Sequence, residues 1–312
     1  MEDSVTRKVQ FRLVDAFAER PLTGNPAGVV LDADSLTEAD MQAVAREVNA
    51  SETAFILGAN DLHAAPRLRW FTPAAEVGFC GHATLAAAHA WSEVLGLRAM
   101  LGKPDARVTF RTAAGELTLT PEIVSEERGN LVWWLDMPDP DLKPDHSNPM
   151  KMLELLGLAA DALDAGVPVM RTRDNDIILL VRSWRALVEA RPDFQRLARF
   201  SEKHNIRGLC VATLETLSDF VHVVSRFFAP SCGVDEDPVT GSVHGPLAVL
   251  LTVNDLVPSA GGRAAINCLQ GQPAGRTGIV RALVTRGSGG YRVSIGGACH
   301  TTICGELFLP PA

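Results

Sequence analysis

The stretch RWFTPAAEVGFCGHATLAAAHAW, residues 69–91, decides the fold, because a second stretch repeats its order. Residues 226–251 read RFFAPSCGVDEDPVTGSVHGPLAVLL. Each has an arginine, two aromatic residues, a small residue and a proline, followed by an acidic loop with glycine and an apolar helix. The two loops differ in length by three residues, so the repeat is imperfect. The shared order predicts two pseudo-symmetric half-domains, each a curved sheet around a buried central helix.

The rest of the chain supplies the strands and outer helices of such a fold. Residues 35–49 predict an amphipathic helix N-capped by Ser35 or Thr37, and a single helix is predicted near 183–199. Alternating patterns predict strands at 8–17, 51–57 and 66–73 and a hairpin over 106–123. We therefore expect an α+β protein with mixed or antiparallel sheets. Its half-domains span 1–125 and 126–302, and the last strand, about 303–312, joins the first half.

Composition and charge exclude several classes of function. With 46% hydrophobic and 21% charged residues, the 312-residue chain has the composition of a soluble globular protein. A net charge of −8 without a long basic run argues against nucleic-acid and anionic-membrane partners. No apolar stretch reaches the ~18–20 residues of a membrane span, and no signal sequence is recognisable, so a cytoplasmic location is expected. The six dispersed cysteines fit a reduced compartment.

The two buried helices predict an anion-binding site. If both N-termini face a cleft between the halves, free backbone N–H groups and two positive dipole ends converge there. Such a cleft favours a substrate carboxylate. Gly81, Gly241 and Ser242 are small enough for a ligand to approach the backbone closely.

Three residues near these helices are candidates for acid/base chemistry, and each has a structural alternative. Glu52 begins a short strand and is either a surface turn carboxylate or a general acid/base. His82 follows Gly81 at a helix start, where the dipole favours the neutral imidazole; it either contacts substrate or caps the helix. Asp237 belongs to an acidic loop that is either a solvated turn or part of the anion site.

Cys80 precedes Gly81, a position that lowers the pKa of a thiol and would suit a thiol-based racemase. Such an enzyme needs an opposed acid/base group. The matching residue before Gly241 is Thr240, whose hydroxyl is far too weak an acid or base. Cys80 is therefore either one half of an unsymmetrical pair or a small packing residue.

Metal and cofactor motifs are not recognisable. Cys299, His300 and Cys304 alternate as in a strand and lack a second half-site, so no metal is predicted. No Gly-rich nucleotide motif precedes a helix, so no cofactor is expected. Residues 241–245, GSVHG, depart from the G-x-S-x-G pattern of a hydrolase.

Four ordered motifs resemble the PhzF family, the phenazine-biosynthesis-like isomerases, whose fold is that of diaminopimelate epimerase. They are VDAFAERPLTGNPAGVVLDA at 14–33, AREVNASETAFI at 45–56, RWFTPAAEVGFCGHATLAAA at 69–88 and DEDPVTGSVHGPLA at 235–248. The resemblance covers essentially the whole chain.

The resemblance implies roles for individual residues. Glu52 would be the acid/base that moves a proton between substrate carbons, assisted by His82 and Asp237. The implied substrate-binding residues are Gly81, Gly241, Ser242, Asn25 and Cys80. It also implies a homodimer.

We therefore expect a cofactor-independent isomerase acting on a small carboxylate-bearing substrate. Two alternatives stay open. One is an amino-acid racemase or epimerase that uses Cys80. The other is a small-molecule binding protein that has kept the fold and lost turnover.

Overall fold

The computed structural model describes residues 7–58, 65–94, 96, 106–125, 130–287 and 289–311. The chain folds into two compact units. Unit 1 contains Met1–Leu135 and Gly296–Ala312, and unit 2 contains Asp136–Ile295. Two long strands, β8 (Asn130–Met137) and β17 (Gly290–Leu309), contribute residues to both units.

The strands of unit 1 pair into a closed ring. Besides β8 and β17 they are β1 (Arg7–Ala16), β2 (Asn25–Val30), β3 (Glu52–Leu57), β4 (Arg67–Phe71), β5 (Glu76–Val77), β6 (Val108–Thr112) and β7 (Gly115–Ser125). Pairing runs antiparallel for β1–β2, parallel for β2–β3, antiparallel for β3–β4, parallel for β4–β6 and antiparallel for β6–β7 and β7–β8. β8 pairs with β17, and β17 returns antiparallel to β1. β5 forms a short hairpin with β4.

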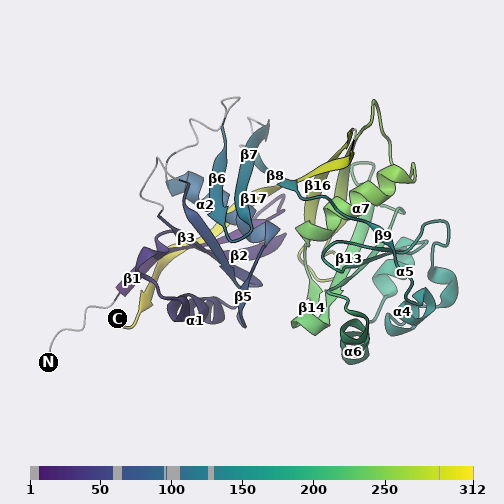
Figure 1. The fold of residues 1–312 in the computed structure, drawn as a ribbon, viewed down its shortest axis with the longest axis horizontal. Helices are drawn as coiled ribbons and strands as arrows, with labels where there is room; N and C mark the ends of the chain where they lie inside the picture. The colour runs from purple at the N-terminus through teal and green to yellow at the C-terminus, as the bar shows by residue number, and fades with distance from the viewer. Residues whose placement is uncertain are drawn as a thin grey trace. The chain divides into compact units, whose positions relative to one another are not determined.

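The helix α2 (Gly81–Val94) is enclosed by these strands (Figure 1). Its residues from Gly81 to Ser92 are all buried, and five of them are alanines, whose small side chains let the strands approach on every side. The predicted buried helix of the first half is confirmed.

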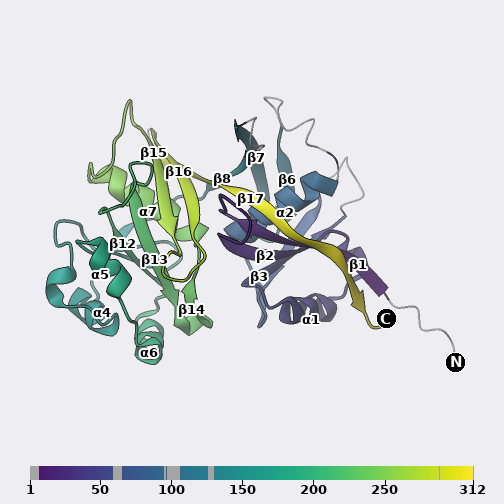
Figure 2. The same cartoon turned by 180° about the vertical axis from the view of Figure 1, so that it is seen from behind.

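The helix α1 (Glu38–Val48) covers the outer side of the ring (Figure 2). Thr37 is its N-cap and forms a capping box with Asp40, which confirms one of the two predicted caps. Its apolar stripe packs against the outward side chains of the sheet, among them Phe55. The sheet of unit 1 is therefore buried on both faces beside α1.

The strands of unit 2 follow a comparable order. They are β9 (Lys143–Pro144), β10 (Met170–Arg171), β11 (Ile177–Leu180), β12 (Leu209–Thr213), β13 (Val223–Ala229), β14 (Val234–Asp237), β15 (Arg263–Gln270) and β16 (Gly278–Gly287). Pairing is antiparallel for β9–β10 and β10–β11, parallel for β11–β12, antiparallel for β12–β13, parallel for β13–β15 and antiparallel for β15–β16. β14 forms a hairpin with β13.

One face of this sheet carries α7 (Gly241–Val253), and the other carries α4 (Pro149–Leu155), α5 (Trp184–Glu189) and α6 (Phe194–His204) (Figure 2). The outer helices share a core with inward residues of β11, β12 and β13. Three short 3-10 helices complete the described chain: η1 (Ala33–Ser35), η2 (Ala160–Ala162) and η3 (Pro230–Cys232).

The single helix predicted near 183–199 is wrong. It is two helices, α5 and α6. Pro192 lies between them and has no N–H for a continuing helix, and Asp193 caps α6 by accepting a hydrogen bond from the Arg196 N–H.

Among the described residues, no helix is long and apolar enough to cross a membrane.

Candidate active site

The backbone of unit 1 directs Glu52 toward the central helix. α1 ends at Val48, its C-cap Asn49 adopts the left-handed conformation, and β3 begins three residues after the cap, at Glu52. Successive strand residues point to opposite faces, and Phe55 packs on the α1 side. Glu52 therefore shares the opposite face with Ala54, the face that meets α2.

Glu52, His82 and Cys80 form a chain of contacts at the start of α2. Glu52 Oε2 lies 3.3 Å from His82 Nε2, and Cys80 Sγ lies 3.4 Å from His82 Nδ1. The Glu52 side chain is 21% exposed, whereas Cys80 and His82 are buried. The structure thus brings three of the predicted residues together, with the carboxylate as the most accessible group.

His82 is neutral at pH 7, because burial lowers its pKa to about 4. An ionised carboxylate can only accept, so Glu52 beside Nε2 favours the tautomer with the imidazole hydrogen on Nε2, and the Cys80 thiol can then donate to Nδ1. Nε2 is buried and, in the described part of the chain, lacks an aligned hydrogen-bond partner despite the nearby carboxylate. A buried donor of this kind can be satisfied by a substrate atom.

The same three residues form a candidate metal cluster, since their ligand atoms lie within 4.8 Å of one another. Cys80 contacts Nδ1 and Glu52 contacts Nε2 of His82. The same contacts can also pass a proton between the thiol and the carboxylate through the imidazole.

Asn25 lies beside this chain at the start of β2. β2 runs parallel to β3, with Ala27 opposite Glu52. The Asn25 side chain is fully buried, and its Oδ1 accepts a hydrogen bond of 3.4 Å from Ser51 Oγ. The residue therefore orders the backbone next to Glu52.

Gly81 begins α2, whose first turn contains no acidic residue. The N–H of Thr84 is the first to bond back to Cys80 O, so the preceding N–H groups of the turn have no intrahelical acceptor. The helix dipole adds a partial positive charge at this end. A carboxylate is the natural ligand for such a terminus.

In unit 2, Asp237 belongs to a network before α7. Its carboxylate accepts a hydrogen bond of 2.5 Å from Thr240 Oγ1. Gln270, which is fully buried, donates to the Asp237 carbonyl and accepts from the Thr240 N–H. Because Thr240 turns its hydroxyl to Asp237, it does not cap α7.

Gly241 and Ser242 form the first turn of α7, which also contains no acidic residue. His244, one turn into the helix, is held by Thr240 O at 2.7 Å from Nδ1 and by Ser225 Oγ at 2.9 Å from Nε2. A carbonyl can only accept, so Nδ1 carries the hydrogen and Nε2 accepts from Ser225. Burial lowers the pKa of His244 to about 4, so it stays neutral.

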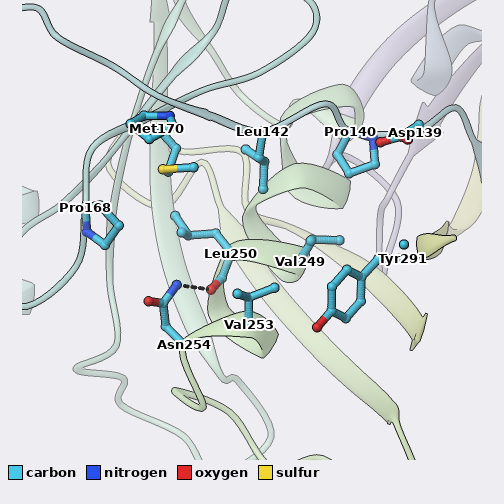
Figure 3. A pocket seen from close by; sticks show the side chains of 12 residues that line it. Asp139, Pro140, Leu142, Pro168, Met170, Val249, Leu250, Val253, Asn254 and Tyr291 are labelled. Carbon is cyan, nitrogen blue, oxygen red and sulfur yellow. Dashed lines mark hydrogen bonds between the residues drawn. The ribbon is translucent and has the colours of Figure 1, made fainter. Parts of the chain in front are cut away.

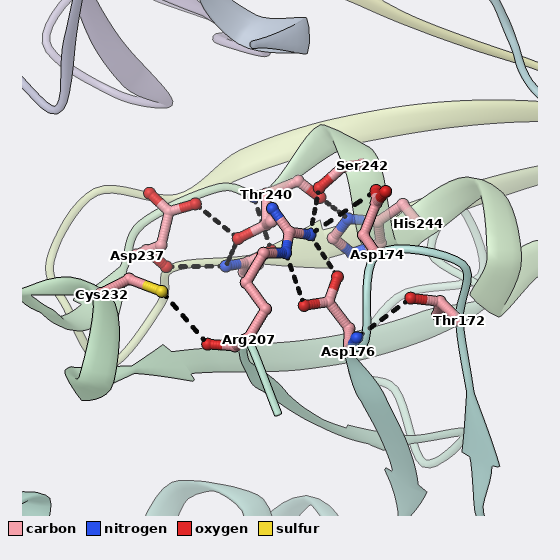
Figure 4. A network of polar contacts seen from close by, with 10 residues as sticks. Thr172, Asp174, Asp176, Arg207, Cys232, Asp237, Thr240, Ser242 and His244 are labelled. Carbon is pink, nitrogen blue, oxygen red and sulfur yellow. Dashed lines mark hydrogen bonds and ion pairs between the residues drawn. The ribbon is translucent and has the colours of Figure 1, made fainter. Parts of the chain in front are cut away.

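Arg207 and Asp176 also meet the start of α7 and were not predicted as site residues (Figure 4). Arg207 donates to both carboxylate oxygens of Asp176 and, over 2.9 Å, to Ser242 Oγ. Neither residue belongs to a recognisable motif. One sequence signal was present: Arg207 follows Asn205 at the end of a helix, much as Glu52 follows Asn49.

A separate cavity of about 420 Å³ in unit 2 is lined by apolar side chains, including Leu142, Met170, Val249 and Val253 (Figure 3). Tyr291 lies at one side of it. It contains no residue proposed for catalysis or substrate binding.

The ring of strands around a buried helix in unit 1 belongs to a fold that solved PhzF-family and epimerase structures share. The family model described as Phenazine biosynthesis-like protein, PhzC-PhzF, matches residues 14–305. The chain therefore belongs to the PhzF family, as the sequence motifs predicted.

Individual relatives agree with this assignment. An uncharacterized isomerase of Pseudomonas aeruginosa is 41% identical over 238 residues, covering 76% of this chain and 79% of the relative. The crystal structure of the Bacillus anthracis phenazine biosynthesis protein of the PhzF family is 28% identical, with a TM-score of 0.85, covering 96% of this chain and 99% of that one. A hydroxyproline epimerase from Agrobacterium vitis shares the fold at 13% identity and a TM-score of 0.58, covering 97% and 93%.

Proposed function

We propose that this protein is a cofactor-independent isomerase that moves a proton between carbons of a small carboxylate-bearing substrate. The observation that carries the proposal is the contact of Glu52 with His82 at the start of α2. Glu52 is the accessible member of the Glu52–His82–Cys80 chain, and the relatives named isomerases support the reaction class.

In the proposed reaction, the Glu52 carboxylate removes a proton from an acidic C–H bond of the substrate. The electron pair is delocalised toward an adjacent unsaturated group, and the protonated Glu52 then returns the proton to another carbon. The overall reaction is redox-neutral and needs no co-reactant. Neutral His82 presents its Nε2 hydrogen beside Glu52 and can stabilise either the carboxylate or the developing negative charge.

The carboxylate of the substrate would be held by backbone N–H groups in the first turn of α2, from Gly81 to Ala83, where no acidic side chain competes. In unit 2, the start of α7 at Gly241 and Ser242 also lacks an acidic side chain and is a separate candidate for binding a carboxylate. Asp237, which accepts a hydrogen bond from Thr240, would act by ordering the residues before α7.

We also infer that the two units are structural repeats. In both units the strand pairs alternate: antiparallel, parallel, antiparallel, parallel and antiparallel. The order is β1–β2–β3–β4–β6–β7 in unit 1 and β10–β11–β12–β13–β15–β16 in unit 2. A short hairpin, β5 or β14, precedes the central helix in both. This common order supports the pseudo-symmetry expected from the repeated sequence stretches.

The proposed function is tested by proton exchange in D₂O. Purified protein is incubated with a panel of small carboxylates that contain an acidified C–H bond, and mass spectrometry measures deuterium incorporation. Glu52→Gln should reduce exchange on the order of a hundredfold to ten-thousandfold and leave binding nearly intact. Glu47→Gln, on the exposed side of α1, is the matched control and should exchange like the wild type. Unchanged exchange in Glu52→Gln would reject Glu52 as the base.

The contact of Cys80 with His82, which can take up the thiol proton, supports a second candidate, an amino-acid racemase or epimerase in which Cys80 acts on one face of the substrate carbon. Glu52 and His82 would have to move apart from the thiol to act on the other face, because the three groups lie within 4.8 Å of one another. A Cys80→Ala variant separates the candidates, because full activity of that variant excludes the thiol mechanism. Tight carboxylate binding without any exchange would instead indicate a binding protein.

A further inference from the structure

The connection after an outer helix carries a different functional group in each unit. In unit 1, Asn49 is the C-cap of α1, and Glu52 at the start of the following strand reaches His82, the second residue of α2. In unit 2, Asn205 is the C-cap of α6, and Arg207 before the following strand reaches Ser242, the second residue of α7. Both strands pair in parallel with the preceding strand of the sheet. Arg207 thus lies in the same connection of unit 2, between the outer helix and the following strand, as the proposed base does in unit 1.

The guanidinium of Arg207 is fixed on three sides. Nε and Nη2 donate to the two carboxylate oxygens of Asp176, whose side chain is 1% exposed. The guanidinium carbon lies 5.8 Å from the centre of the Phe227 ring. Nη2 also donates to Ser242 Oγ, and the close view shows the guanidinium between Asp176 and the start of α7 (Figure 4). The Arg207 side chain remains 38% exposed.

This geometry determines what the Ser242 hydroxyl can do. Arginine can only donate hydrogen bonds, so Ser242 Oγ must accept from it. The hydrogen of the hydroxyl is then directed to a different acceptor. Within the described chain Ser242 makes no other side-chain hydrogen bond, and no acidic residue occupies the first turn of α7. The hydrogen of the Ser242 hydroxyl is therefore available to a ligand at the start of a helix.

The charge of Arg207 is already matched by the paired Asp176, and Asp174 lies 4.0 Å from Nη2. The residue is thus a poor choice for binding an anion by charge alone. Its planar, forked donor geometry is what allows it to hold Asp176 and Ser242 at the same time.

We propose that Arg207, held by Asp176, is a positioning residue that makes the Ser242 hydroxyl a dedicated donor to a ligand carboxylate at the start of α7. This inference rests on the proposed function in that the ligand is a carboxylate. It adds the group that orients the carboxylate-binding hydroxyl in unit 2.

The test is a double-mutant cycle on binding, with trifluoroacetate as the probe and ¹⁹F NMR as the readout on the full chain. Arg207→Lys keeps a positive charge beside Asp176 but loses the fork, and should weaken binding about fivefold. Ser242→Ala removes the donor and should weaken it about tenfold or more. If Arg207 acts through Ser242, the double variant should bind as weakly as Ser242→Ala and no more weakly.

Arg196→Lys is the matched control, because Arg196 pairs with Glu154 of α4 on the face of the sheet opposite α7 and should keep wild-type affinity. The inference is overturned if Arg207→Lys binds the probe as tightly as the wild type does. It is also overturned if the Arg207→Lys substitution weakens binding by the same factor in the Ser242→Ala protein as in the wild type. It is also overturned if the wild type does not bind the probe or if Ser242→Ala has no effect. The double-mutant cycle measures binding and needs no turnover. Proton exchange that persists in Glu52→Gln would therefore reject the proposed function without changing the outcome of the binding test.

Discussion

Replacing Gly271 with alanine tests how tightly the loop between β15 and β16 packs against its backbone neighbours. Gly271 has φ +86°, and a Cβ added to it would overlap the carbonyl oxygen of Arg276 and lie 2.5 Å from that of Pro238. Both neighbours are backbone atoms, so no side-chain rotation relieves the clash. Gly275 provides a control in the same turn, with φ +77° and open space around its Cβ.

The expected magnitudes follow from these two environments. Left-handed backbone with a Cβ costs about 1–2 kcal/mol, which is the whole expected loss for Gly275→Ala. Overpacking against fixed atoms adds about 1–3 kcal/mol, so Gly271→Ala should lose about 2–5 kcal/mol. The preceding residue, Gln270, holds Thr240, so the shift should also disturb the start of α7.

Urea unfolding at pH 7 measures both losses as changes in the free energy of unfolding. Equal losses for Gly271→Ala and Gly275→Ala would refute the reasoning, because they would show that the Pro238 and Arg276 segments move aside without cost. A circular dichroism spectrum like that of the wild type establishes that each variant is folded before the comparison.

Two further predictions concern packing and pH. Gly297→Ala should destabilise the protein by about 1–3 kcal/mol, because the added Cβ would overlap the buried Phe17 ring. Gly305→Ala in the same strand meets open space and should be neutral or slightly stabilising. Thermal unfolding of the two variants measures both effects. His244 has a pKa of about 4 in the folded protein because it is buried, so the unfolded chain takes up the proton first as the pH falls, and the stability present above pH ~6.5 is lost toward pH 4. By pH 5 this loss is about 2 kcal/mol. Urea unfolding measures the free energy of unfolding at pH 7 and pH 5, and the drop between them should be about 2 kcal/mol smaller in His244→Gln than in the wild type. An equal drop in both proteins would contradict the assignment.

The regular elements of this fold could be predicted because each carries a local signal. Thr37 and the residues after it predict α1, and the alternation around residues 106–123 predicts the hairpin of β6 and β7. The break at Pro192 was missed because apolar residues continue on both sides of it. The two-residue strand β5 is too short to show any period.

The candidate site was predicted in part, and the reason is the distance along the chain between its members. Glu52 and His82 lie in motifs that the family resemblance identifies. Arg207 lies 31 residues from Asp176 and 35 from Ser242, and none of these spacings is a motif. Their meeting depends on the parallel pairing of β11 with β12, which brings the ends of two separated strands together. Such a network is recognisable only once the sheet is known.

The closed ring of unit 1 has a consequence for how the chain is made. Arg7 in β1 pairs with Leu309 in β17, so the ring cannot close until the ribosome has synthesised the last strand. Unit 2 is a continuous segment, Asp136–Ile295, and its strands are complete before that point. We expect the strands of unit 2 to pair before the ring of unit 1 closes, while β1 keeps one unpaired edge, because contacts of such long sequence separation form late.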